Sequence, residues 1–172
     1  MDILIVPFGE VEHEVKELIK KKLNEAFGRG VSESGKERLP DYAFDSMRDQ
    51  YLSIRIINRL EEETDFKRFE KVLGIIDADL FVPGFRFIFG QAGRKAAVIA
   101  LERLHERFWG LPENRALYLR RAAIEAVHEL GHSYGLAHCE NARCVMYFSN
   151  TIDDTDRKGA DFCGECVRRL GN

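Results

Sequence analysis

One stretch constrains this chain more than any other: it begins at His128 and reads His-Glu-Leu-Gly-His-Ser-Tyr-Gly-Leu-Ala-His. If its first half is helical, His128 and His132 lie on one face, where two imidazoles can reach one metal ion. Glu129 lies about a hundred degrees around the helix from His128, which suits a general base rather than a third ligand. Gly135 can end the helix in a left-handed turn that brings His138 to the same metal. Three histidine ligands and an open position are typical of catalytic zinc.

The length of this pattern decides its interpretation. A bare His-Glu-x-x-His also arises by chance on ordinary amphipathic helices, whereas the extension to His138 fixes two further positions. The other two histidines, His13 and His105, are isolated in the sequence and are expected to be surface or structural residues. Met146 follows His138 by eight residues, where a methionine beneath the ligands would form a Met-turn. The alternative for this methionine is a core-filling role.

The four cysteines gather in the last quarter of the chain, as Cys139, Cys144, Cys163 and Cys166. The last two have the two-residue gap of a zinc knuckle, and the first two form a second pair with four residues between them. We expect a closed structural zinc site, with two disulfides or a redox dithiol as the alternatives. Because Cys139 directly follows His138, this site would tie the tail to the catalytic turn.

Size and charge restrict the partners. A chain of 172 residues suffices for one compact domain. A formal net charge of -3 gives no broad basic surface for nucleic acid or an anionic membrane. The first residues, Met1 to Pro7, lack the basic leader of a signal peptide, and no apolar run is long enough to cross a bilayer. We therefore expect a cytoplasmic monomer that binds neither nucleic acid nor membranes.

Hydrophobic periodicity predicts an α/β (α+β) fold in which helices pack on a mixed, twisted sheet. Helices are expected over 10–27, 46–61 and 114–134, the last of them capped by Asn114, with its packing face separate from its ligand face. Strands are expected over 2–7, 71–77, 85–89 and 96–101, the last two as a hairpin, with 28–40 as a loop. Within a single domain spanning 1–172, we expect an N-terminal sheet and helix part (1–137) and a C-terminal zinc-knuckle part (138–172).

The combined pattern of histidines, methionine and cysteines from His128 to Cys166 resembles the archaemetzincins, zinc-dependent peptidases of the metzincin clan. The segments 73–83 and 87–90 also resemble the strand region of that family. The resemblance implies a metzincin-like fold with two zinc ions: a catalytic zinc on the three histidines, with Glu129 as general base, and a structural zinc on the four cysteines. It also implies that an extended peptide pairs with a strand on the cleft rim, either 85–90 or 96–101.

The expected function is zinc-dependent hydrolysis of peptide bonds in a peptide or protein substrate. Zinc lowers the pKa of bound water from about 16 towards about 7. Glu129 would accept the proton of that water and pass it to the leaving amine. Tyr147 and Phe148 are candidate walls of the substrate pocket, and Tyr147 is also a candidate oxyanion stabiliser. The competing hypotheses are a zinc-stabilised peptide- or protein-binding module with vestigial catalysis, and a nucleic-acid-binding zinc ribbon built on the C-terminal cysteine pair.

Overall fold

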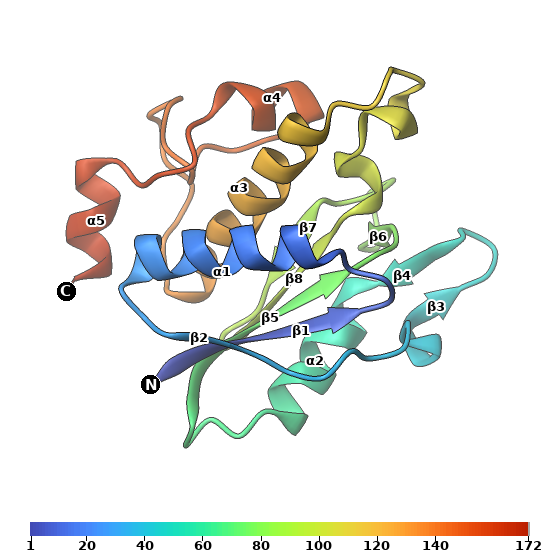
Figure 1. The fold of residues 1–172 in the computed structure, drawn as a ribbon, viewed down its shortest axis with the longest axis horizontal. Helices are drawn as coiled ribbons and strands as arrows, with labels where there is room; N and C mark the ends of the chain where they lie inside the picture. The colour runs from blue at the N-terminus through green and yellow to red at the C-terminus, as the bar shows by residue number, and fades with distance from the viewer. Residues whose placement is uncertain (172) are drawn as a thin grey trace.

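A five-stranded mixed sheet lies at the centre of the molecule, in a computed structural model that describes residues 1–171 (Figure 1). Its strand order is β2-β1-β5-β8-β7. Neighbouring strands from β2 to β8 run parallel, whereas β7 pairs antiparallel with β8 and forms one edge. The strands are β1 (Asp2–Phe8), β2 (Val31–Glu33), β5 (Phe69–Ile76), β7 (Gly90–Ala92) and β8 (Ala96–Ala100).

Both faces of this sheet are buried, because apolar residues follow one another along its central strands. In β1, Ile3 and Ile5 belong to the core on one face, whereas Val6 and Phe8 belong to the core on the other. Two helices cover the first face and one covers the second (Figure 1). They are α1 (His13–Phe27) and α3 (Arg115–Ser133) on the first face, and α2 (Ser53–Glu63) on the second.

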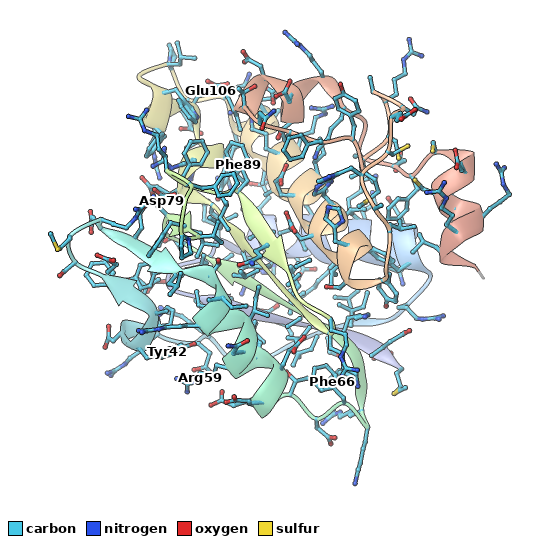
Figure 2. The ribbon with its side chains drawn as sticks, turned by 180° about the vertical axis from the view of Figure 1, so that it is seen from behind. Tyr42, Arg59, Phe66, Asp79, Phe89 and Glu106 are labelled. Atoms are coloured by element: carbon cyan, nitrogen blue, oxygen red, sulfur yellow. The ribbon has the colours of Figure 1, made fainter. Side chains whose placement is uncertain are left out.

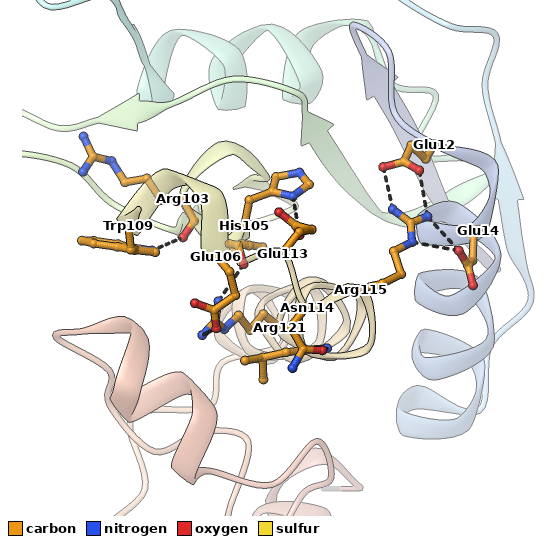
Figure 3. Close-up of polar contacts among 12 residues, drawn as sticks. Glu12, Glu14, Arg103, His105, Glu106, Trp109, Glu113, Asn114, Arg115 and Arg121 are labelled. Carbon is orange, nitrogen blue, oxygen red and sulfur yellow. Dashed lines mark hydrogen bonds and ion pairs between the residues drawn. The ribbon is translucent and has the colours of Figure 1, made fainter. Parts of the chain in front are cut away.

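Helix α3 begins where the sequence predicts, because the Asn114 side chain accepts a hydrogen bond from the backbone N–H of Leu117. Arg115 joins its first turn to the start of α1 through ion pairs of 2.7 Å with Glu12 and Glu14 (Figure 3). The helix is buried on nearly all sides, since the sheet and α1 lie against part of it and the C-terminal segment against the rest. The predicted packing residues Ala126, Val127 and Leu130 belong to the core, whereas His128 and His132 line a cavity, although His128 is itself buried.

Shorter elements complete the chain. A second sheet has the order β3-β4-β6, and Figure 2 shows from behind that Tyr42 and Phe66 lie near α2, which carries Arg59. The elements are β3 (Phe44–Asp45), β4 (Gln50–Leu52), β6 (Leu80–Phe81), the 3-10 helices η1 (Asp41–Ala43), η2 (Glu102–Leu104) and η3 (Glu106–Trp109), α4 (Ile152–Arg157) and α5 (Gly164–Leu170). In residues 1–171, no helix combines the length and apolar character needed to cross a bilayer.

Three predicted elements differ from the structure. The helix predicted over 46–61 begins only at Ser53, because the preceding residues form β3, β4 and the turn between them. The predicted hairpin exists between β7 and β8, but 85–89 contributes only an isolated bridge from Ile88 to Leu80. The predicted loop over 28–40 contains β2, which pairs with β1.

Candidate metal centre and cleft

Three imidazoles converge where α3 ends. His128 and His132 lie one turn apart, with their Nε2 atoms separated by 3.2 Å. The chain then reverses at Gly135, whose φ of 91° lies in the left-handed region, as the sequence predicts. His138 returns to the same point, so that one nitrogen from each of the three rings lies within 4.8 Å of the others.

Backbone carbonyls fix the orientation of the two helical histidines. Nδ1–H of His128 donates to the carbonyl of Val145 at 2.7 Å, and Nδ1–H of His132 donates to that of Leu136, also at 2.7 Å. Because a carbonyl only accepts, each ring keeps the lone pair of Nε2 for a metal. Burial lowers the pKa of all three histidines, to about 2 for His128. The rings are therefore held neutral, which is the form that binds zinc.

Glu129 lies beside this centre and is also buried, with 7% of its surface exposed. Burial, with a smaller contribution from the neighbouring carboxylate of Glu125, raises the pKa of Glu129 to about 8. The side chain packs directly against the edge strand: a Cβ atom at Gly90 would lie 2.6 Å from its Cγ. The carboxylate is therefore held between the histidines and β7, inside the cleft that both line.

The cleft is a cavity of about 630 Å³. The three histidines and Glu129 line it together with β7, the segment before β7, and Phe148 to Asn150. Of the two segments predicted as the rim, 96–101 contains the inner strand β8, whereas 85–90 reaches the edge strand β7 only at Gly90. Phe148 lies in the cleft and packs on His138 with ring centroids 4.7 Å apart. Tyr147 does not line the cleft, and its carbonyl faces Lys158 instead.

A buried ion pair behind His128 was not anticipated from the sequence. The ammonium group of Lys158 lies 3.5 Å from Oε1 of Glu125 and 3.3 Å from Nδ1 of His128. Lys158 is fully buried at 0% exposure. The hydroxyl of Thr155 donates to the same Glu125 oxygen at 3.1 Å. No local signal distinguishes Lys158 among the polar residues that surround it in the sequence, because its role depends on a contact between distant segments.

The four cysteines also gather, as the sequence predicts, with their sulfur atoms within 4.8 Å of one another. Cys139 and Cys163 are 3.8 Å apart, and Cys144 and Cys166 are 3.7 Å apart, well beyond the roughly 2.05 Å of a disulfide bond. The backbone N–H of Cys163 donates to the sulfur of Cys144. The pKa of Cys163 is lowered to about 7, chiefly by a hydrogen bond from the backbone of Cys166. Four converging thiols of this kind fit a tetrahedral zinc ion.

Met146 connects the two clusters. It is fully buried, and its sulfur lies against the backbone of α3 at Gly131, where an added Cβ would approach it to 2.5 Å. Its carbonyl accepts a hydrogen bond of 2.9 Å from the backbone N–H of Cys139. Met146 therefore packs beneath the helical turn that carries His132. Its backbone is hydrogen-bonded to Cys139, the residue that follows His138.

Comparison with known proteins identifies similar chains over the whole length. Residues 4–172 match peptidase family M54. The archaemetzincin of Methanocaldococcus jannaschii is 41% identical over 172 residues, which cover 99% of this chain and 93% of the relative. The crystal structure of archaemetzincin from Methanopyrus kandleri has a TM-score of 0.85 at 33% identity and covers 99% of this chain and 93% of its own. That of a zinc-dependent peptidase from Methanocorpusculum labreanum has a TM-score of 0.88 at 28% identity, with 98% and 99% covered.

Proposed function

This chain belongs to peptidase family M54 and is a zinc metallopeptidase, and from that premise we propose that its three clustered histidines bind the catalytic zinc while Glu129 acts as general base. The convergence of three neutral imidazoles beside a buried carboxylate, in one cleft, carries the proposal. When bound in such a site, zinc lowers the pKa of a water molecule to about 7 and polarises the carbonyl of the substrate.

The protein residues orient the ligands and transfer protons. His128 and His132 present Nε2 because Val145 and Leu136 occupy their Nδ1 hydrogens. Glu129 accepts a proton from the attacking water and passes it to the nitrogen of the leaving amine. Its contact with Gly90 keeps its carboxylate at one place in the cleft, so that it does not have to reorganise between these two transfers.

The substrate is a peptide or protein, bound in extended form along the edge strand β7. The second edge of β7 is unpaired in the sheet order, so its backbone groups can pair with an added strand. Phe148, packed against His138, forms part of the wall beside the cleaved bond. Tyr147 lies outside the cleft lining, so we assign the wall to Phe148 alone.

A second, structural zinc is proposed on the four cysteines, which gives two zinc ions per chain. The mutual approach of the four thiols and the N–H bond to the sulfur of Cys144 support this proposal. Met146 would form the Met-turn. Its side chain is buried against α3, which carries His128 and His132, and its carbonyl is hydrogen-bonded to Cys139, which follows His138.

The decisive experiment compares zinc-loaded wild type with Glu129→Ala on a broad peptide library. Removing a general base is expected to lower the rate by about 100-fold to 10,000-fold. Zinc content should stay the same, because Glu129 is not a ligand. Glu62→Ala, an exposed change on α2, is the matched control and should retain full activity. Equal activity of wild type and Glu129→Ala, or no cleavage by either, would instead support a zinc-stabilised binding module.

The cytoplasmic location, the monomeric state and the division at 137/138 stay predictions. Cys144, Val145 and Met146 share one hydrophobic core with α1 and α3, which supports a single domain for the chain as a whole. Light scattering during gel filtration measures the oligomeric state, and one cooperative unfolding transition is the expected behaviour of a single domain.

A further inference from the structure

A second cavity of about 490 Å³ adjoins the catalytic cleft. Phe87 and Asn150 line both cavities, so the two lie next to each other. Large apolar side chains are exposed around it: Trp109 is 39% exposed and Leu111 is 56% exposed. Exposed apolar groups that gather at a cleft mark a binding surface more often than isolated ones do.

One wall of this cavity is a fixed row of aromatic rings. Phe87 packs edge-on against Trp109, with ring centroids 6.2 Å apart. The guanidinium of Arg103 lies 4.0 Å from the centre of the Phe87 ring and is itself held by Asp79 at 2.7 Å. The indole N–H of Trp109 donates to the carbonyl of Arg103 at 2.9 Å (Figure 3). Phe89, which lies at the same end of the molecule as Asp79 in Figure 2, packs edge-on against Phe87. The wall is therefore organised before any ligand arrives.

The opposite wall is the start of α4, and a buried arginine ties the two walls together. Arg121 of α3 is 2% exposed and pairs with Glu106 of η3 at 2.9 Å (Figure 3). It also pairs with Asp156 of α4 at 2.7 Å. Of the three carboxylates that line the cavity, Glu106 and Asp156 are thus already paired, and the third, Asp153, is exposed. The surface that they leave for a ligand is mainly apolar, formed by the aromatic row, Leu111 and Ile152.

We propose that this cavity is a distal subsite that binds one bulky aromatic or aliphatic side chain of the peptide substrate, away from the cleaved bond. The inference rests on the proposed function and specifies its substrate class. The volume lies within the roughly 300 to 1,000 Å³ of ordinary ligand sites. An extended peptide advances about 3.3 Å per residue, so a chain held in the cleft reaches the cavity with a residue beyond those at the cleaved bond. The occupant is the substrate because the cavity adjoins the cleft through Phe87 and Asn150.

The kinetic test uses short peptides that fill only the cleft and the same peptides extended on the amino or the carboxyl side with Phe, Leu or Ser at the distal position. In one of the two series, distal Phe or Leu should lower KM relative to Ser by about tenfold or more with kcat unchanged. Leu111→Ser and Trp109→Ala should abolish this advantage and leave the short peptide unaffected. Met47→Ser, an exposed apolar-to-polar change elsewhere on the surface, should alter neither substrate.

A binding test is available because Trp109 is the only tryptophan of the chain. Zinc-loaded Glu129→Ala titrated with the extended Phe peptide should show a change in tryptophan fluorescence that the short peptide does not produce. Adding Leu111→Ser to this variant should weaken the titration at least fivefold while the tryptophan remains as reporter.

Two results would overturn the subsite: an equal effect of Leu111→Ser on short and extended peptides, or calorimetric binding of the extended peptide without any fluorescence change. Failure of the proposed function has a different signature, namely cleavage that survives Glu129→Ala or no cleavage of any peptide. The fluorescence titration still decides on the subsite in that case, because it requires binding and not hydrolysis.

Discussion

Glu129 packs so closely against Gly90 that a Cβ atom on the glycine would lie 2.6 Å from Cγ and 2.9 Å from Oε1 of the glutamate. The edge strand and the proposed general base are therefore fitted to each other. A Cβ atom at Gly90 would also meet the carbonyl oxygen of Val98 at 2.9 Å, so any larger residue would displace the carboxylate or the strand. Gly90 has an ordinary negative φ, so this glycine is required by the space around it and not by its backbone conformation.

Gly90→Ala should therefore lower kcat, by about 100-fold if the carboxylate moves by about 1 Å. Zinc content should be unchanged, since the three histidines are not touched. Steady-state kinetics measure kcat, and the melting temperature shows whether the variant is folded at the temperature of the assay. Gly35→Ala is the matched control because an added Cβ there meets nothing within 4 Å, and it should be fully active. An unchanged kcat for Gly90→Ala would contradict the positioning role.

Lys158→Met should destabilise the fold by about 3–5 kcal/mol, because it leaves the carboxylate of Glu125 buried without its cation. The double variant Glu125→Gln, Lys158→Met should recover most of this loss, since no uncompensated charge then remains. Urea unfolding of the zinc-loaded proteins measures both values. A double variant no more stable than Lys158→Met would show that Lys158 acts through another partner.

Gly131→Ala should destabilise the protein although alanine is the better helix former by about 1 kcal/mol. The added Cβ would lie 2.5 Å from the sulfur of buried Met146, and overpacking of this kind costs about 1–3 kcal/mol. Gly164→Ala is the control within a helix, because its nearest neighbour is the end of the Arg168 side chain at 3.7 Å. Thermal unfolding should separate the two variants, and equal melting temperatures would exclude the clash.

Cys163→Ser should release the proposed structural zinc and also weaken zinc binding at the three histidines. The reason is geometric: Cys139 belongs to the cysteine site, follows His138, and donates its N–H to Met146. Zinc content per chain, measured against a graded chelator, should fall from two to one or fewer, with activity lost at lower chelator concentration than in wild type. Wild-type chelator sensitivity at the remaining site would show that the two sites are independent.

The candidate ligands could be predicted from the sequence because their spacing is local. Two histidines one helical turn apart face the same way in any helix, and Gly135 supplies the turn that returns His138. The cysteines follow the same logic, since short gaps place each pair in one turn. The structure brings together every residue of both clusters.

The supporting residues could not be predicted, because they depend on contacts between distant segments. Lys158 reaches His128 across 30 positions, and Gly90 reaches Glu129 across the sheet edge. The predicted helix start at 46 was wrong for a related reason: Met47 fits the helical spacing but is 97% exposed in the turn between β3 and β4. Strand pairing overrides local periodicity there.

The order of residues along the chain also determines when the enzyme can become active during its own synthesis. Proteins are made from the amino end, and their early segments begin to fold first. The helix that carries His128 and Glu129 emerges before Val145, whose carbonyl orients His128, and before Lys158, which pairs with Glu125 of the same helix. A nascent chain therefore contains the histidine motif of α3 before the residues that hold this motif in place have been made. Peptide hydrolysis therefore has to await the segment that carries Val145 and Lys158.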